Sequence, residues 1–151
     1  MSIGEILLKL GLALVLGGAI GIERETSHKP AGFRTNVLIC LTSAMMMILS
    51  EMFAGRTGTG ADSGMRVAAG VITGVGFLGA GAILHSRGSV HGLTTASVIW
   101  AVAGLGLVVG AGFYLPAVIF TAIVVVTLVV FRKVERAINH DHGGEQRHND
   151  R

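Results

Sequence analysis

Four long stretches of this chain contain no Lys, Arg, Asp, Glu or His: Leu10–Ile22, Thr35–Ser50, Val67–Leu84 and Gly92–Phe131. A helix needs about 17–25 mostly apolar residues to cross the hydrocarbon core of a bilayer. Hydrophobic residues make up 51% of the chain and charged residues only 14%, so polar side chains cannot cover a water-facing surface. We therefore expect an integral membrane protein, and neither a soluble domain nor a disordered chain.

The lengths of these stretches predict an all-α, polytopic bundle of about five transmembrane helices. The last stretch has 40 residues, enough for two helices joined by a turn at 110–112. Gly in that turn favours the end of a helix, and Pro116 suits the first turn of the next one. Residues 1–132 should form the transmembrane domain, and 133–151 a short, disordered, cytoplasmic tail. The expected spans are 3–22, 34–54, 67–84, 94–110 and 114–132.

The basic residues are divided unequally between the two sides that five spans define. Nine of the twelve Lys and Arg residues fall on one side, whereas Arg56 and Arg66 lie on the other, with Lys9 near its edge. The positive-inside rule places the richer side in the cytoplasm, so the N-terminus should be outside and the C-terminus inside. Glu5 and Lys9 are spaced i,i+4 in the first span and can pair near the outer surface.

Glycine recurs at helical spacing in several spans. Helices in lipid associate through close van der Waals contact, which small residues permit, and we assign the glycines to helix packing. The third span has five glycines within twelve residues, although each costs about 1 kcal/mol in a helix interior. Close contact on several sides is the favoured explanation, and a helix break beside a water-filled path is the alternative. The predicted packing residues are Gly17, Gly21, Gly70, Gly74, Gly76, Gly79, Gly81, Gly106 and Gly110.

Polar residues near the membrane gather on the predicted cytoplasmic side. We expect an inner-face vestibule that binds an ion, a lipid headgroup or a partner protein, and the alternative is that these charges only anchor the helices. Glu23 or Glu25 can pair with Arg34 or Arg87 there. Trp100 is included because a mid-span indole N–H needs an acceptor, with core packing as its alternative role. The candidate binding residues are Glu23, Arg24, Glu25, Arg34, Thr35, Asn36, Arg87, Thr94, Thr95, Ser97 and Trp100.

No metal or cofactor site can be assigned from the sequence. Glu51 and Asp62 belong to the outer side, but two carboxylates do not supply the octahedral oxygen ligands of Mg²⁺. No nucleophile, zinc or nucleotide-binding motif has its required context. We therefore expect no enzyme, no cofactor and no nucleic-acid partner. Membrane lipid, further copies of the chain and another membrane protein are the expected partners.

Four segments of the chain resemble the MgtC/SapB family of bacterial inner-membrane proteins. In chain order they are Gly17–Glu25, Ala31–Asn36, Gly74–Ile83 and Gly92–Trp100. Longer members of the family carry a soluble domain after the last span. The chain resembles a short form without that domain.

The resemblance implies a multi-pass inner-membrane protein with a regulatory role in adaptation to low Mg²⁺ and, in pathogens, survival inside host phagocytes. It also implies the proton-driven ATP synthase as a partner that such a protein restrains. The alternative is a transporter or channel for Mg²⁺ or another cation, with a pathway along the glycine-rich third span.

Overall fold

The computed structural model describes residues 1–57, 62–86 and 89–145. It confirms the all-α fold class, because five helices are long and apolar enough to cross a membrane. A two-stranded antiparallel hairpin, in which Ser86 faces Ser89, separates the third and fourth helices. The elements are α1 (Ile3–Thr26), α2 (Phe33–Thr57), α3 (Asp62–Gly81), β1 (Leu84–Ser86), β2 (Ser89–His91), α4 (Leu93–Gly110) and α5 (Tyr114–Glu145).

Two element boundaries differ from the sequence-based expectation. α3 ends at Gly81, and the chain continues into β1 where the third span was expected to reach residue 84. α5 continues to Glu145, so 133–145 extend the last helix where a disordered tail was expected, and 146–151 lie outside the described residues. The predicted turn between α4 and α5 is present, and Gly112 has the positive φ of +82° that closes it.

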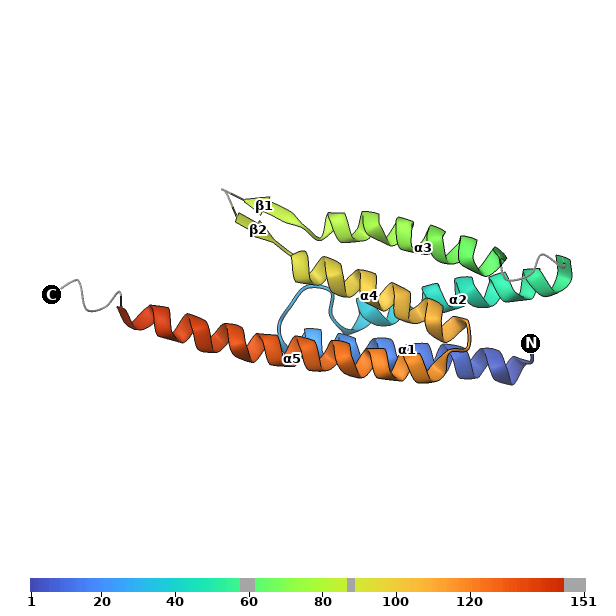
Figure 1. Ribbon diagram of the computed structural model, residues 1–151, viewed down its shortest axis with the longest axis horizontal. Helices are drawn as coiled ribbons and strands as arrows, with labels where there is room; N and C mark the ends of the chain where they lie inside the picture. The colour runs from blue at the N-terminus through green and yellow to red at the C-terminus, as the bar shows by residue number, and fades with distance from the viewer. Residues whose placement is uncertain (58–61, 87–88, 146–151) are drawn as a thin grey trace.

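The helices run along one long axis, and the two ends of the bundle differ (Figure 1). The α1–α2 connection and the β hairpin lie at one end, which we call the hairpin end, and α5 extends past them. The N-terminus, the end of α2, the start of α3 and the α4–α5 turn lie at the other end, which we call the N-terminal end. The N-terminus and the last turns of α5 therefore lie at opposite ends of the molecule, as an odd number of crossings requires.

The core lies between α1, α2 and α4. Of the most apolar 18 residues of each span, 61% are buried in α4, compared with 6% in α3 and 11% in α5. α4 is thus the central helix, whereas α3 lies at the edge of the bundle, against α2 and α4. The fully buried side chains include Ala13 and Ile20 of α1, Cys40 and Ala44 of α2, and Val102, Leu105 and Val109 of α4.

Four of the predicted packing glycines lie where helices touch: Gly17 and Gly21 of α1, and Gly106 and Gly110 of α4. A Cβ added at Gly17 would lie 2.6 Å from the Cβ of Cys40, and one added at Gly106 would lie 2.7 Å from the Cβ of Ser43. Both distances are too short for real carbon atoms, so α2 can approach α1 and α4 only because these positions carry no side chain.

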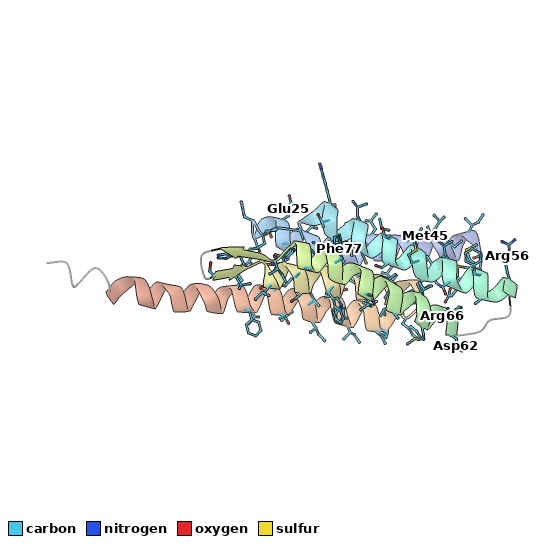
Figure 2. The ribbon with its side chains drawn as sticks, turned by 90° about the horizontal axis from the view of Figure 1, so that it is seen from above. Glu25, Met45, Arg56, Asp62, Arg66 and Phe77 are labelled. Atoms are coloured by element: carbon cyan, nitrogen blue, oxygen red, sulfur yellow. The ribbon has the colours of Figure 1, made fainter. Side chains whose placement is uncertain are left out.

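The glycines of α3 lie in a different environment. A Cβ at Gly70, Gly74, Gly76 or Gly81 would meet no atom within 4 Å, and one at Gly79 would make an ordinary 3.7 Å contact with Ala96. The expectation of close contact on several sides of the third span is therefore wrong within this chain. α3 is also continuous from Asp62 to Gly81, without the alternative break. Figure 2 shows α3 on the outside of the bundle, with Phe77 82% exposed on it.

Candidate functional site

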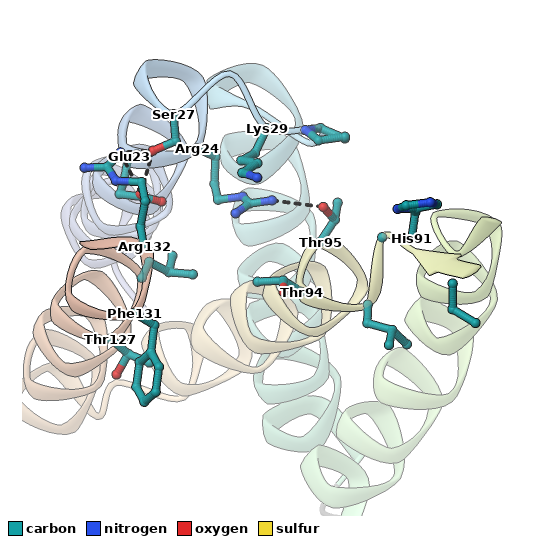
Figure 3. A pocket seen from close by; sticks show the side chains of 15 residues that line it. Glu23, Arg24, Ser27, Lys29, His91, Thr94, Thr95, Thr127, Phe131 and Arg132 are labelled. Atoms are coloured by element: carbon teal, nitrogen blue, oxygen red, sulfur yellow. Dashed lines mark hydrogen bonds and ion pairs between the residues drawn. The ribbon is translucent and has the colours of Figure 1, made fainter. Parts of the chain in front are cut away.

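Arg24 is buried at the hairpin end because of its position on α1. Residues 13, 16, 20 and 24 follow one another at helical spacing, so Arg24 continues the buried stripe of that helix. Its side chain is only 4% exposed. The guanidinium Nη2 donates a hydrogen bond of 2.9 Å to Oγ1 of Thr95, which links α1 to the first turn of α4 (Figure 3).

The start of α4 is shaped by Gly92. Its φ of +90° is a left-handed conformation that side chains disfavour, and a Cβ there would overlap the carbonyl of Ala82. Gly92 is the N-cap residue, and no side-chain hydrogen bond caps the helix. Thr95 is 4% exposed, and its hydroxyl accepts a hydrogen bond from Arg24.

Glu23 ties α1 to α5 on the opposite side of Arg24 (Figure 3). Its Oε1 accepts a hydrogen bond of 2.7 Å from Oγ of Ser27 and lies 3.4 Å from Nη1 of Arg132. Arg132 also donates to Oγ of Ser27. Among the described residues the basic partner of Glu23 is Arg132 of the last helix and not Arg34, as expected, whereas Arg87 lies outside the described residues.

These residues line a cavity of about 710 Å³ between α1, the start of α4 and α5, which we call the hairpin-end pocket. Three cations, Arg24, Lys29 and Arg132, face one carboxylate, that of Glu23, so the fixed charge of the pocket is positive. The polar residues that line it are Glu23, Arg24, Ser27, Lys29, His91, Thr94, Thr95, Thr127 and Arg132.

A metal ion does not fit this donor set. In the described part of the chain, no group of three or more His, Cys, Asp or Glu residues is placed to hold a metal ion. Divalent cations such as Mg²⁺ prefer carboxylate and carbonyl oxygens, and the side chains of the hairpin-end pocket are mainly hydrogen-bond donors. The pocket is suited to a negatively charged group.

Comparison with known proteins leads to the same family as the resemblance. The MgtC family model matches residues 10–137. The chain belongs to the MgtC family. No solved structure matches it significantly.

Several curated relatives are similar over most of this MgtC-family chain. Protein SapB of Bacillus subtilis is 41% identical over 142 residues, which are 91% of the chain and 61% of that protein. The putative magnesium transporter YhiD of Escherichia coli K12 is 42% identical over 134 residues, with coverage of 86% and 62%. Protein MgtC of Salmonella typhimurium is 39% identical over 133 residues, with coverage of 88% and 55%. The chain thus spans about three-fifths of the length of these relatives.

The eleven predicted vestibule residues do not form one site in the MgtC-family bundle. Glu23, Arg24, Thr94 and Thr95 line the hairpin-end pocket. Another hollow is lined by Glu25, Arg34 and Thr35, together with Ile22, Thr26, Gly32 and Phe33. Arg87 lies outside the described residues.

The other three predicted residues have structural roles or face outward. Asn36 is fully buried, and its side-chain nitrogen donates to the carbonyl of Gly32 at 2.8 Å, which holds the start of α2. Ser97 is exposed and donates to the carbonyl of Leu93. Trp100 is 54% exposed on the outside of α4, so placing it in the vestibule or the core is wrong.

An ion pair at the N-terminal end was also missed. Lys9 is 2% exposed, and its Nζ lies 2.6 Å from Oε2 of Glu51 on α2. The expected pairing with Glu5 is wrong, because Glu5 forms a capping box with Ser2 at the start of α1. The helical spacing 9, 13, 16, 20, 24 was the available signal, because it places Lys9 on the same buried stripe as Arg24.

Proposed function

We propose that this chain is a regulatory module of the bacterial inner membrane in Mg²⁺ homeostasis and stress adaptation, which acts by binding a partner and not by carrying ions. Its family membership supports the setting: one relative is named a putative magnesium transporter and another is MgtC. Because the chain spans about three-fifths of these relatives, the proposal concerns the membrane bundle alone.

The proposal depends on the separation between two buried polar clusters, one around Lys9 at the N-terminal end and one around Arg24 at the hairpin end. Lys9 and Arg24 lie on one face of α1, fifteen positions apart, which is about 22 Å along a helix. The side chains between them on that face, Ala13, Leu16 and Ile20, are apolar and buried. The facing part of α4 is apolar too, from Val98 to Val109. An ion path needs a continuous polar lining, and this interface does not supply one.

The charges at the two ends support a cytoplasmic hairpin end. Arg24, Lys29, Arg34 and Arg132 belong to that end, whereas Figure 2 places Arg56 and Arg66 at the N-terminal end. The positive-inside rule then puts the C-terminus in the cytoplasm and the N-terminus outside.

The two activities can be separated by a flux measurement and a binding measurement. We expect proteoliposomes that contain the purified chain and a magnesium-sensitive dye to take up Mg²⁺ no faster than empty liposomes, with or without a membrane potential. We expect a membrane protein to co-purify with the wild-type chain and to be lost with Arg34→Ala, because Arg34 is exposed at the hairpin end. The ATP synthase is the first candidate partner to probe.

Arg56→Ala is the matched control, because it removes an exposed guanidinium from the opposite end. It should leave the co-purification unchanged. Mg²⁺ uptake that scales with the amount of protein would overturn the regulatory proposal in favour of transport.

A hollow between α2 and α3 favours transport as the second candidate function. It has a volume of about 330 Å³, and Thr42 and Ser43 bring hydroxyl groups to a lining that is otherwise apolar apart from Gly74. Hydroxyl and backbone oxygens near the middle of a span can replace part of an ion's hydration shell. If the chain transports cations there, Gly74→Leu should block uptake and Gly70→Leu should not. Neither position has an atom within 4 Å of an added Cβ, and Gly70 does not line the hollow.

Self-association is the third part of the proposal. Ala69, Thr73, Gly76 and Ala80 form an exposed stripe of small residues at helical spacing on α3, and such stripes let helices approach closely in lipid. We expect an oligomer in mild detergent, which Gly76→Leu dissociates and Gly70→Leu does not. A wild-type chain that is monomeric at all concentrations in lipid nanodiscs would contradict this part.

A further inference from the structure

One half of the hairpin-end pocket has a surplus of positive charge. Arg132 lies 3.4 Å from Glu23 and offsets its carboxylate on the α5 side, which leaves Arg24 and Lys29 on the α4 side (Figure 3). The Nε of Arg24 is buried and has no hydrogen-bond partner among the described residues. Buried polar atoms are normally paired, and an unpaired charged donor is especially unfavourable. This half of the pocket therefore calls for an acceptor that carries negative charge.

The start of α4 adds donors to the same half. α4 has 18 residues, and its N-cap Gly92 makes no side-chain cap. The first backbone hydrogen bond into the helix runs from the N–H of Ala96 to the carbonyl of Gly92 at 2.9 Å. The N-terminal amides and the helix dipole favour an anion at this position, and the Thr94 and Thr95 hydroxyls lie in the same turn.

The exposed residues that line the pocket include apolar as well as polar side chains. Leu93 and Phe131, which also line the pocket, are 57% and 67% exposed. In a membrane-spanning bundle, exposed apolar side chains of this kind face the acyl chains of lipid. The pocket thus combines cationic groups with exposed apolar side chains, a combination that suits an amphiphilic ligand.

We propose that the half of the hairpin-end pocket formed by Arg24, Lys29 and the first turn of α4 binds a phosphate group. A phosphate offers several acceptor oxygens in different directions, which match the guanidinium fork, the ammonium group and the helix N-terminus. Two sources carry this group, the headgroup of an anionic phospholipid and a small soluble phosphate ester.

Glu23 gives a further element of recognition. Its Oε1 is held by Ser27, but its Oε2 is buried without a hydrogen-bond partner among the described residues. A carboxylate oxygen in this position accepts a hydrogen bond from a ligand hydroxyl, as a glycerol phosphate would provide. The site does not depend on whether the chain regulates a partner or transports ions.

The test uses the full purified chain in detergent and measures binding by native mass spectrometry. Dioleoyl phosphatidylglycerol is compared with dioleoyl phosphatidylcholine, which has the same acyl chains but no net charge. The wild-type chain should retain the anionic lipid preferentially. Lys29→Gln should weaken that binding about tenfold, the size expected for losing one charge-assisted contact. Lys29 is exposed, so this substitution leaves the packed core intact.

Arg34→Gln is the matched control, because it removes one exposed positive charge from the same end but from the other hollow. It should change phosphatidylglycerol binding by less than about twofold, the effect expected of a remote surface charge. Equal losses for Lys29→Gln and Arg34→Gln would overturn the proposal, because they would mean general attraction of anions to a basic surface.

Glycerol 3-phosphate distinguishes the two sources. If millimolar glycerol 3-phosphate displaces phosphatidylglycerol and raises the thermal stability of the wild-type chain but not of Lys29→Gln, the soluble ester is a ligand. If it does neither while the lipid preference holds, the ligand is the lipid headgroup. If the chain does not prefer phosphatidylglycerol to phosphatidylcholine, whose phosphate is neutralised by its own choline group, and glycerol 3-phosphate does not raise its thermal stability, the proposed site for an anionic phosphate is wrong.

Discussion

α3 and α4 are both charge-free in their apolar parts and both carry several glycines, yet they occupy opposite kinds of position. α4 lies in the centre of the bundle, whereas α3 lies at its edge (Figure 1). Gly106 and Gly110 of α4 are pressed against α2, with backbone and side-chain atoms closer than a Cβ would allow. Gly70, Gly74 and Gly76 of α3 have open space around them. The same residue type at the same spacing therefore serves two different purposes.

The difference teaches that glycine spacing marks a face on which close approach is possible, but not what approaches it. On α4 the approaching element is α2 of the same chain. On α3, Gly79 faces α4, Gly74 lines the hollow beside α2, and Gly76 lies on the exposed small-residue stripe. Gly106 and Gly110 of α4 are thus accounted for by packing within the chain, Gly74 of α3 by the hollow, and Gly76 by the surface we assign to self-association.

Gly106→Leu should give the largest effect, because it forces a branched side chain into the contact between α4 and α2. We expect a loss of about 3 kcal/mol or more in the free energy of unfolding, the upper range for overpacking a core. Denaturation by SDS in mixed micelles, followed by circular dichroism, measures it.

Gly104→Leu is the control on the same helix, because a Cβ at Gly104 meets no atom within 4 Å. It should change the unfolding free energy by less than about 1 kcal/mol. Equal losses at the two positions would break the distinction between packed and open glycines.

The packed part of the bundle also contains the ion pair between Lys9 and Glu51, and Glu51→Gln tests its contribution to stability. The substitution leaves the ammonium group of Lys9 buried beside a neutral amide. Removing one partner of a fully buried pair is strongly destabilising, but Glu51 has a side chain that is 40% exposed, so water reduces the cost to about 2 kcal/mol. Lys9→Met combined with Glu51→Gln should recover at least half of this loss in the same unfolding measurement. A single variant as stable as the wild type would show that Lys9 is solvated.

The elements that the sequence predicted correctly depend on local signals. The five spans follow from runs of apolar residues, and the turn at Gly112 follows from glycine between two such runs. The β hairpin was not predicted, because its strands have three residues each and are stabilised by pairing with one another. Such pairing leaves no periodicity that a short window can detect.

The candidate site also has some features that local spacing predicts and others that depend on contacts between distant parts of the chain. The position of Arg24 at the end of the buried stripe of α1 was accessible from helical spacing. The contact of Ser27 with Arg132 could not be predicted in this way. The two residues are 105 positions apart in the chain and meet only through the packing of α1 against α5. Trp100 was misplaced because depth along a span says nothing about which face of the helix a residue occupies.

Gly76→Ala should have effects of opposite sign on the stability of the monomer and on the association of the oligomer. In the monomer an Ala at this open position should stabilise α3 by up to about 1 kcal/mol, because it restricts the unfolded chain and favours the helix. In the oligomer the added methyl group would push two copies of α3 apart, and the same substitution should weaken association. Unfolding at low and at high protein-to-detergent ratios separates the two terms. A loss of stability in the monomer would mean that α3 packs within the chain after all.

Trp100→Leu should give the smallest effect, although the residue is a tryptophan in the middle of the most buried helix. Its side chain is 54% exposed, so in the bilayer the exposed part contacts acyl chains. Leucine is as apolar as those chains and can replace this contact. We expect the unfolding free energy to change by no more than about 0.5 kcal/mol. Lipids brominated near mid-chain should quench the fluorescence of Trp100 in the wild type, which confirms its contact with lipid independently of stability. A loss above about 1 kcal/mol without quenching would place Trp100 against protein, and α4 would then be packed on the face that the structure leaves open.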